Sequence, residues 1–315
     1  MPYVFAVDLG GTKCSAAVVD RSGRIVSRRM LPVDIGSPWG PVRQIAQLAN
    51  DLAGKRKVKD AFRSAGVAVP GLVRSDGTVW APNLPGWKRM PVANRLKQLL
   101  GIPVIVESDR NAAVLGESWR GAARGKSDVI VLVIGTGIGA GILSGGRIVR
   151  GAHELSGCAG WLTVTREDVP DASRLGQLES LVAGPAIARA ARTRLRSGEK
   201  SSLSQLEAAQ ITARAVAAAA RRGDRLALDI FQGCGRLLGF GVANIVSLFD
   251  PEVVIIGGGL ASAADLYLEA LKTAMYERAQ PLAAKQAKIT VSTLGELGQL
   301  LGSARLAWEF IRAGK

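Results

Sequence analysis

Two turns rich in glycine and threonine are the parts of this chain whose residue types most clearly suggest chemistry. The first reads Asp8-Leu-Gly-Gly-Thr-Lys13, and the second reads Gly135-Thr-Gly-Ile-Gly139. Glycine turns let backbone N–H groups approach phosphate oxygens, because no Cβ stands in the way. Either turn alone would fit an ordinary β-hairpin equally well. Two similar turns at matched positions favour a cleft in which two lobes hold one polyphosphate.

The elements around the two turns are also repeated. Each turn follows an apolar run, Val4–Val7 or Ile130–Ile134, and leads into a second apolar run. A Gly-Arg-Ile-Val stretch, 23–26 or 146–149, ends each unit. Short apolar runs bounded by glycine turns are typical of strands. We therefore expect two copies of one unit, in which a glycine turn and a tight turn join three strands.

A third glycine turn, Gly257–Gly259, follows the apolar stretch 251–256. A strand that ends in a glycine turn and opens a helix offers N–H donors and a favourable dipole to an anion. Glycine after a strand is more often simple turn chemistry. This turn therefore adds a candidate contact with a nucleotide, at Gly258 and Gly259.

The remaining pattern alternates strands and helices in the first half and ends in long helices rich in alanine and arginine. Further strands are expected at 66–69, 103–107, 251–256 and near residue 289, and helices at 42–52, 92–100, 111–123, 179–197, 204–222, 224–249 and from 300 onward.

The size of the chain predicts two domains. Its 315 residues, of which 48% are apolar, are about twice the common domain size. We expect an N-terminal α/β domain at 1–124, a C-terminal α/β domain at 125–300, and a final helix at 301–315 that packs back on the first domain. No run of about 18 apolar residues occurs, so we expect no membrane-spanning helix.

Cysteine usage and the N-terminus predict a cytoplasmic protein. Asp8 and the glycines after it interrupt the first apolar run, which argues against a signal peptide. The three cysteines, Cys14, Cys158 and Cys234, are widely spaced and have no metal-ligand spacing. A reducing compartment is the simplest interpretation of such usage.

The charge balance is strongly basic, with 41 Lys and Arg against 26 Asp and Glu, a net charge of +15. The densest run, Arg189–Lys200, continues an alanine-rich helical pattern, which favours a solvated helical face over a nucleic-acid site. No aromatic residues are interleaved for stacking on bases. We therefore expect no nucleic-acid partner, while inorganic polyphosphate stays open as a phosphoryl donor.

Several motifs together resemble the ROK family (repressors, open reading frames, kinases) of the actin–hexokinase–Hsp70 superfamily. This family includes bacterial glucokinases and N-acetylhexosamine kinases. The resemblance runs nearly end to end, and it implies an α/β fold of two actin-like (ribonuclease H-like) domains with a cleft between them. The motifs beyond the first turn are Pro82-Asn-Leu-Pro-Gly-Trp87, Asp109-Arg-Asn-Ala-Ala113, Ile134-Gly-Thr-Gly-Ile-Gly139, Gly176-Gln-Leu-Glu179, Ile256-Gly-Gly-Gly259 and Leu294-Gly-Glu296.

The resemblance implies an ATP- and Mg²⁺-dependent sugar kinase. Asp109 matches the family's general base, which takes the proton of the acceptor hydroxyl. Its alternative role is that of a helix N-cap. Asp8 matches the acidic residue near magnesium, for which a carboxylate is a suitable hard ligand. Lys13, also a candidate, could be an ordinary solvated lysine. The residues that match the nucleotide-binding turns are Gly10, Gly11, Thr12, Lys13, Thr136, Gly137, Gly258 and Gly259.

The acceptor side departs from the family pattern. The family's Gly-Glu-x-Gly-His segment reads Gly157-Cys-Ala-Gly-Trp161 here, so Cys158 and Trp161 replace a sugar-binding glutamate and histidine. That histidine also serves a structural zinc, and the cysteines that complete the zinc site are absent from 161–179. We therefore predict no zinc. Ser108 stands where the family has an asparagine, and Asn83 and Glu179 are retained as expected contacts for sugar hydroxyls.

Two alternatives stay open for the altered segment. Trp161 could stack on a sugar or its substituent, or it could be core packing of a collapsed zinc loop. His153 and Glu154 could rebuild the lost contacts, although an ordinary surface turn is the simpler interpretation.

Three functions fit these observations. The first is a sugar kinase, glucokinase-like, whose acceptor is an altered sugar or polyol. The second is a sensor or pseudokinase that binds a ligand without turnover. The third, a DNA-binding repressor, is disfavoured because such proteins carry an N-terminal helix-turn-helix, whereas the first phosphate motif begins at Asp8. A homodimer is expected from the family's habit alone.

Overall fold

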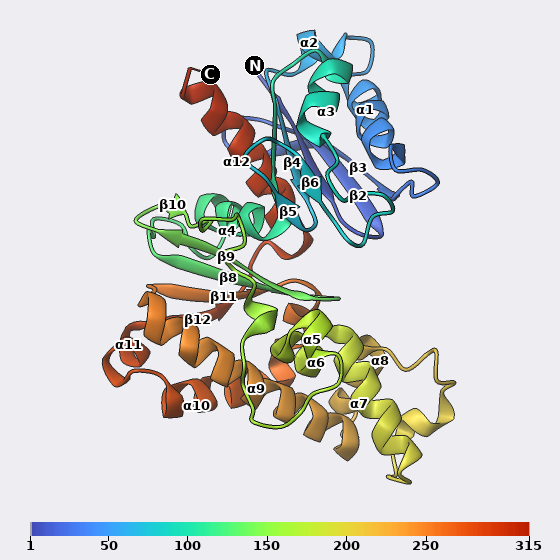
Figure 1. Ribbon diagram of the computed structural model, residues 1–315, viewed down its shortest axis with the longest axis vertical. Coiled ribbons are helices and arrows are strands. Elements are labelled where there is room, and N and C mark those ends of the chain that lie inside the picture. The colour runs from blue at the N-terminus through green and yellow to red at the C-terminus, as the bar shows by residue number, and fades with distance from the viewer. Residues whose placement is uncertain (1, 315) are drawn as a thin grey trace.

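The computed structural model describes residues 2–314 and contains two five-stranded sheets of equivalent topology (Figure 1). The first three strands of each sheet pair antiparallel and the last two join parallel, so the predicted repeat is confirmed. The first sheet has the order β3 (Ile25–Pro32), β2 (Lys13–Val19), β1 (Val4–Leu9), β4 (Ala65–Val69), β7 (Val104–Ser108). The second has the order β10 (Arg147–Ile148), β9 (Ile138–Ser144), β8 (Val129–Ile134), β11 (Val253–Gly257), β12 (Lys288–Val291).

The helices and a small hairpin complete the described part of the chain. The first half holds α1 (Gly40–Ala53), α2 (Val58–Ala61), the hairpin of β5 (Leu72–Val73) and β6 (Val79–Trp80), α3 (Val92–Leu100) and α4 (Asp109–Arg120). The second half holds α5 (Ala172–Leu175), α6 (Gln177–Val182), α7 (Gly184–Arg196), α8 (Ala213–Arg221), α9 (Arg225–Phe249), α10 (Leu268–Arg278), α11 (Pro281–Gln286) and α12 (Gly298–Arg312). Short 3₁₀ helices lie at Ala159–Trp161, Ser202–Gln205, Gly259–Leu266 and Gly295–Leu297.

Both faces of each sheet are covered. Along β1 the side chains alternate, as a pleated strand requires. Phe5 and Val7 join the core under α1 and α3, whereas Val4 and Ala6 face α12. The second sheet packs α6, α7, α9 and α10 on one face and α4 on the other. Helices α4 and α12 therefore lie between the two sheets (Figure 1).

Helix α12 packs on the first sheet although it ends the chain. The Ser303 hydroxyl donates to the carbonyl of Val7 at 2.8 Å, and the Ser64 hydroxyl donates to the carbonyl of Ala307 at 3.0 Å. The helix begins at Gly298, two residues before the start at residue 300 that is expected from the sequence. The domain boundaries at 124 and 300 stay a prediction.

Two of the predicted helices are shorter or broken. The pattern over 179–197 forms α6 and α7, separated at Ala183, whose backbone is extended. Pro185 lacks an N–H group and disfavours a continuous helix through this point. The pattern over 204–222 forms helix α8 only from Ala213 onward, capped by the Thr212 hydroxyl.

Helix α9 is long and apolar enough to cross a membrane by length and composition alone. In the structure, 61% of its most apolar stretch is buried inside the protein, and its side chains belong to the second core. The helix is thus the core helix of the second half of the chain.

The contact between α4 and α12 depends on glycine. A Cβ at Gly302 would lie 1.7 Å from the carbonyl oxygen of Ala112, whereas a Cβ at Gly298 meets nothing within 4 Å. We expect Gly302→Ala to destabilise the protein by about 3 kcal/mol, because α12 must move away from α4. Gly298→Ala is the matched control and should leave the melting temperature unchanged or slightly raised. Thermal unfolding measures both, and equal melting temperatures would contradict this packing.

Candidate functional site

Asp109 is the first residue of α4 and follows directly on strand β7. The N-cap position belongs to Ser108, whose side chain makes no capping hydrogen bond. One carboxylate oxygen of Asp109, Oδ1, accepts a hydrogen bond from the backbone N–H of Arg110 at 2.8 Å. Burial raises the pKa of Asp109 above its ordinary value, against the hydrogen bond and charge of Arg110. A carboxyl group with a raised pKa at a strand end is suited to accept a proton.

Asp8, near the end of β1, is electrostatically coupled to Asp109. Burial and, to a smaller extent, the Asp109 carboxylate raise the pKa of the Asp8 carboxyl to about 7, while the Arg28 guanidinium opposes both. Arg28 is held by its Nε, which donates to the Ser15 hydroxyl at 2.9 Å. Glu296 adds a smaller effect that also raises the pKa of Asp8. A cation that bound between Asp8 and the phosphates would relieve this repulsion.

The raised pKa of Asp8 predicts that the metal-free protein loses stability as pH rises from about 4 to about 7. In this window the unfolded chain ionises Asp8 while the folded chain still binds the proton. The full loss is on the order of 4 kcal/mol, at about 1.4 kcal/mol per pKa unit. Thermal unfolding in chelator should therefore show Asp8→Asn gaining on the wild type between acidic and neutral pH. A parallel fall of both proteins would contradict the assigned pKa.

The first glycine turn joins β1 to β2. The backbone N–H of Gly10 donates to the carbonyl of Lys13 at 2.8 Å, which closes the turn. Gly11, Thr12 and Lys13 are exposed. A Cβ on Gly11 would lie 3.9 Å from the Cβ of Asn83, so the Pro82–Trp87 segment runs next to this turn.

The second glycine turn joins β8 to β9 and borders a cavity of about 610 Å³. Gly135 and Thr136 line one side of this cavity, and Gly259 lines another. Gly258 does not line it. At Gly258 φ is +78°, and a Cβ would lie 2.5 Å from the carbonyl oxygen of Ile134, so this position requires glycine for close packing.

The other walls of the cavity come from α7 and α8, which sequence reasoning missed. Arg192 and Arg221 line it, but both are engaged within the protein. Arg192 donates to the carbonyl of Ile211 at 3.0 Å, and Arg221 binds the two carboxylate oxygens of Asp265 at 2.6 and 2.9 Å. The exposed Arg214 also borders the cavity. The Gly184-Pro185 pair at the break between α6 and α7 was the sequence signal for this wall.

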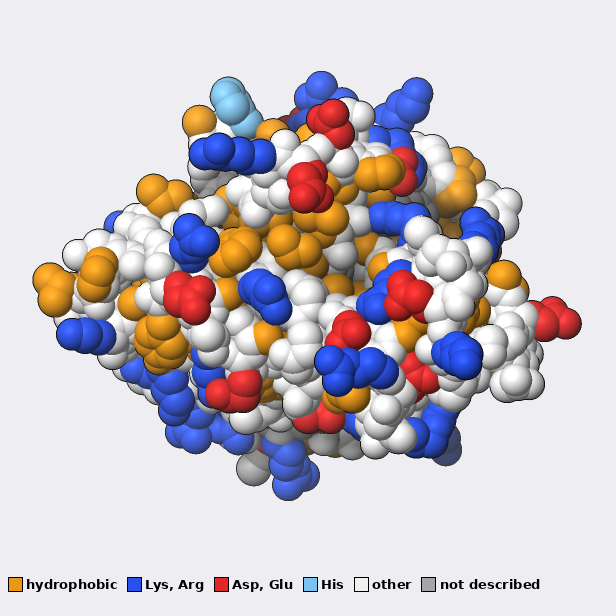
Figure 2. Space-filling model, turned by 90° about the horizontal axis from the view of Figure 1, so that it is seen from below, with side chains coloured by type: hydrophobic (Ala, Val, Ile, Leu, Met, Phe, Trp, Pro, Cys, Tyr) orange, Lys and Arg blue, Asp and Glu red, His pale blue; other side chains and the backbone are white. Residues whose placement is uncertain are grey.

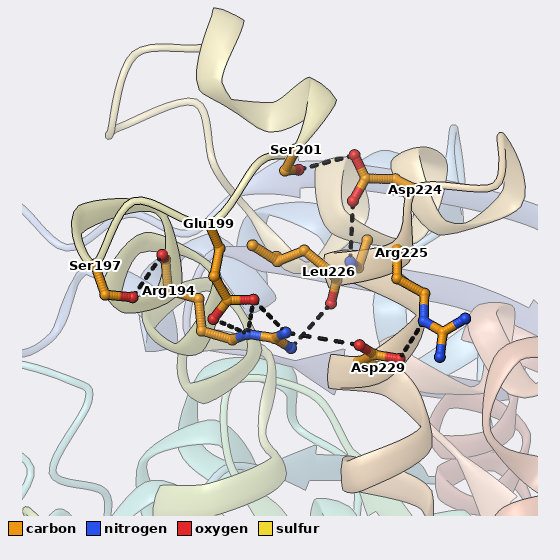
Figure 3. Close-up of polar contacts among 9 residues, drawn as sticks. Arg194, Ser197, Glu199, Ser201, Asp224, Arg225, Leu226 and Asp229 are labelled. Carbon is orange, nitrogen blue, oxygen red and sulfur yellow. Dashed lines mark hydrogen bonds and ion pairs between the residues drawn. The ribbon is translucent and has the colours of Figure 1, made fainter.

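The basic run at 189–200 is largely engaged in contacts within the protein. Arg194 Nε donates to Glu199 Oε1 at 2.8 Å, and its guanidinium lies 3.7 Å from Asp229 (Figure 3). Asp229 also pairs with Arg225 on α9 at 3.2 Å. On the face shown in Figure 2, Lys and Arg side chains are spread among acidic ones. That nucleic acid does not bind stays a prediction.

The predicted acceptor residues lie at separate points around the glycine turns and Asp109. Ser108 is buried, and its hydroxyl has no hydrogen-bonding partner among the described residues. Glu179 Oε2 accepts from the backbone N–H of Ile138 at 2.7 Å. A Cβ on Gly137 would lie 2.8 Å from the same oxygen, so this carboxylate borders the second glycine turn. Burial raises the pKa of Glu179 above its ordinary value, and the Ile138 hydrogen bond opposes this.

The altered segment at 157–161 presents the side chains of its two substituted residues to solvent, whereas Ala159 between them is buried. Cys158 is exposed, and 56% of Trp161 is exposed, so Trp161 is not core packing. His153 is exposed in a turn, and Glu154 has a positive φ of 59°. No contact of these two side chains with another predicted acceptor residue is found among the described residues.

The metal predictions concern two different ions. No group of three His, Cys, Asp or Glu side chains is placed to hold a metal within residues 2–314. Magnesium in phosphoryl transfer is usually held by one or two carboxylates together with the substrate's phosphates and water. Asp8 fits that kind of partial site. In the segment that corresponds to the family's zinc site, for which we predict no zinc, the side chain of Gln177 accepts from the N–H groups of Val164 and Thr165 at 2.6 and 2.9 Å.

Comparisons with known proteins cover nearly the whole chain. The family model of the ROK family matches residues 4–309. A glucokinase of Halalkalibacterium halodurans is 31% identical over 96% of this chain and 94% of its own length. A xylose repressor of Caldicellulosiruptor bescii is 30% identical over 95% of this chain and 76% of its own length.

A solved structure shares the fold. It is a ROK family glucokinase from Streptomyces griseus in complex with glucose and AMPPNP. It is 31% identical, has a TM-score of 0.83, and covers 98% of this chain and 99% of its own. This similarity confirms the predicted α/β fold of two actin-like domains.

Proposed function

Since this chain belongs to the ROK family and is a sugar kinase by its full-length similarity to glucokinases, we propose that it transfers the γ-phosphoryl group of ATP to a hydroxyl group of a hexose or modified sugar. The observation that carries this proposal is the coupled pair Asp8 and Asp109 beside the glycine turns. The Streptomyces griseus relative binds glucose and an ATP analogue. Retention of both carboxylates supports turnover.

We assign Asp109 the role of general base. In the proposed reaction its carboxylate takes the proton of the acceptor hydroxyl while that oxygen attacks the γ-phosphorus, and ADP leaves. The raised pKa of Asp109 makes this transfer more favourable than it would be to an ordinary carboxylate. Thr12 and Thr136 lie in the two turns proposed to hold the phosphates. In these turns and at the end of β11, backbone N–H groups can approach the phosphate oxygens closely because the positions are glycines, namely Gly10, Gly11, Gly137 and Gly259.

We assign the cavity beside Thr136 and Gly259 to the nucleoside part of ATP. Its volume of about 610 Å³ is in the range of small-molecule sites. Its apolar wall is made by residues such as Pro185, Ala188 and Ile211. Asp8 is the residue that would help to hold Mg²⁺, and the ion would supply positive charge against the phosphoryl group.

The acceptor is expected to differ from plain glucose. Glu179, Asn83 and Ser108 remain to contact hydroxyl groups, but Cys158 and Trp161 remove two strong hydrogen-bonding groups and add an exposed thiol and indole. A sugar with an apolar substituent would suit such a surface. Absence of zinc, a cytoplasmic location and a homodimer stay predictions.

A panel of sugars and cyclitols with ATP and Mg²⁺ tests the proposal. We expect acceptor-dependent release of ADP with at least one hexose or modified hexose. If no compound in the panel causes ADP release while an ATP analogue still binds, the result would instead support a ligand sensor without turnover. Repeating the panel with inorganic polyphosphate shows whether ATP is the donor.

A further inference from the structure

Two residues that flank Asp109 in the sequence bind one loop from the second half of the chain, through an ion pair and hydrogen bonds. We name Arg150–Trp161 the acceptor loop, because its last residues include Cys158 and Trp161. Glu107 precedes Asp109 by two residues, and Arg110 follows it. Both contact the acceptor loop, so the proposed base and the altered acceptor segment are physically joined.

The first contact with the loop is an ion pair at the end of β7. Glu107 Oε2 accepts from Arg150 Nη2 at 2.6 Å, and only 8% of the Glu107 side chain is exposed. Its other oxygen accepts from the Ser108 N–H at 2.9 Å and from Asn111 Nδ2 at 3.0 Å. Both carboxylate oxygens of Glu107 are therefore committed, one to the loop and one to residues beside Asp109.

The second contact with the loop is made by Arg110, through two hydrogen bonds. Its Nε donates to the carbonyl of Ser156 at 3.1 Å, and its Nη2 donates to the carbonyl of Glu154 at 3.1 Å. The loop is also closed on itself, since the Ser156 N–H donates to the carbonyl of Arg150 at 2.9 Å. Movement of Arg150 would therefore displace the stretch that Arg110 holds.

Because the Glu107 carboxylate is buried, it depends on Arg150 to compensate its charge. Removing one member of a buried ion pair leaves the other charge desolvated without compensation. Arg150 is exposed, at 43% of its side chain, and its Nε also lies 3.7 Å from Glu154 Oε2 within the loop. Loss of Arg150 would thus release the loop. It would also leave the charge of Glu107 without its partner, and Glu107 accepts from the Ser108 N–H next to Asp109.

We propose that Arg150 and Glu107 are positioning residues that hold the acceptor loop against Asp109, so that the acceptor hydroxyl is aligned with the base. This inference rests on the proposed kinase function. In this chain the ion pair holds the start of the loop on the side of the base, whereas Gly157, near the end of the loop, is held on β9, where its carbonyl accepts from the Ala140 N–H at 2.7 Å. The pair should therefore govern the acceptor and leave the nucleotide untouched.

The test compares Arg150→Met with the wild type in steady-state kinetics. We expect kcat/KM for the acceptor to fall by about 10²-fold, the effect of misplacing reacting groups by about 1 Å. The KM for the acceptor should rise and kcat should fall, while the KM for ATP stays unchanged. Arg150→Lys keeps the charge but has no planar fork, so it should recover part of the loss.

Two further variants separate positioning from general damage. Glu107→Gln in the Arg150→Met background removes the uncompensated buried charge and should restore thermal stability, but not acceptor alignment. Arg225→Met removes an exposed arginine that pairs with Asp229 and should leave the kinetics unchanged. If Arg150→Met alone fails to fold, the double variant and Arg150→Lys still carry the kinetic test.

Hydrogen exchange of the acceptor loop gives a readout that does not need turnover. We expect amides of 151–161 to exchange faster in Arg150→Met, with unchanged protection of β1 and β8. Faster exchange of the loop in Arg150→Met, together with inactivity of the wild type on every sugar, would overturn the kinase proposal. It would still support the claim that Arg150 holds the acceptor loop. Unchanged exchange and unchanged acceptor KM in Arg150→Met would overturn the positioning role.

Discussion

Asp109→Asn is expected to lower acceptor-dependent ADP formation by about 10³-fold, within the range for loss of a general base. The amide cannot take a proton from the acceptor hydroxyl, but it keeps the size of the carboxylate. Its side-chain oxygen can still accept from the Arg110 N–H, which now holds Oδ1 at 2.8 Å. The helix start should therefore be preserved, and the affinity for an ATP analogue should remain. Steady-state kinetics and calorimetric titration measure the two quantities.

The neighbourhood of Asp109 supplies a second signature for this variant. Because the Asp109 carboxylate helps raise the pKa of Asp8, its removal should lower the pKa of Asp8 from about 7. Asp60→Asn, at an exposed position on α2, is the matched control and should retain full activity. Wild-type turnover in Asp109→Asn would remove this residue from the role of base.

The double variant Cys158→Glu, Trp161→His is expected to raise kcat/KM for glucose by about 10²-fold. It restores two groups that the family resemblance assigns to the sugar. Hydrogen bonds to charged groups contribute about 1.5–3 kcal/mol each, so two of them suffice for such a gain. Both positions are exposed, which lets the new side chains enter without repacking a core. Kinetics with glucose and with the wild type's own acceptor should change in opposite directions.

The single variants are the controls for this gain. Cys158→Glu alone should give part of the increase, and Trp161→His alone should mainly weaken the wild type's own acceptor. If the double variant shows no gain with glucose, the acceptor loop holds these positions away from the sugar, and the carried-over geometry is wrong.

Local patterns predicted the repeated strand unit well. Runs such as Val4–Val7 and Ile130–Ile134 are bounded by glycine turns whose register needs no information from elsewhere in the chain. The helix at 179–197 was wrong as a single element, because its alanine-rich periodicity hides the stop at Gly184-Pro185. Glycine and proline are the poorest helix formers in a helix interior, so the pair opens a new helix after the break at Ala183.

The site was less predictable than the fold, because its contacts join distant segments. Asp109 and the glycine turns have motifs of their own. The pairing of Glu107 with Arg150 and the bond between Glu179 and the Ile138 N–H join residues about 40 apart in sequence and depend on tertiary arrangement. No local pattern indicates them.

Identification of the product tests most directly whether this protein is a kinase that uses Asp109 as its base. Wild-type protein is incubated with ATP, Mg²⁺ and the acceptor that releases most ADP, and the product is analysed by mass spectrometry and ³¹P NMR. We expect one phosphorylated sugar for each ADP, formed about 10³-fold more slowly by Asp109→Asn. ADP release without a sugar phosphate, or equal product from both proteins, would contradict it.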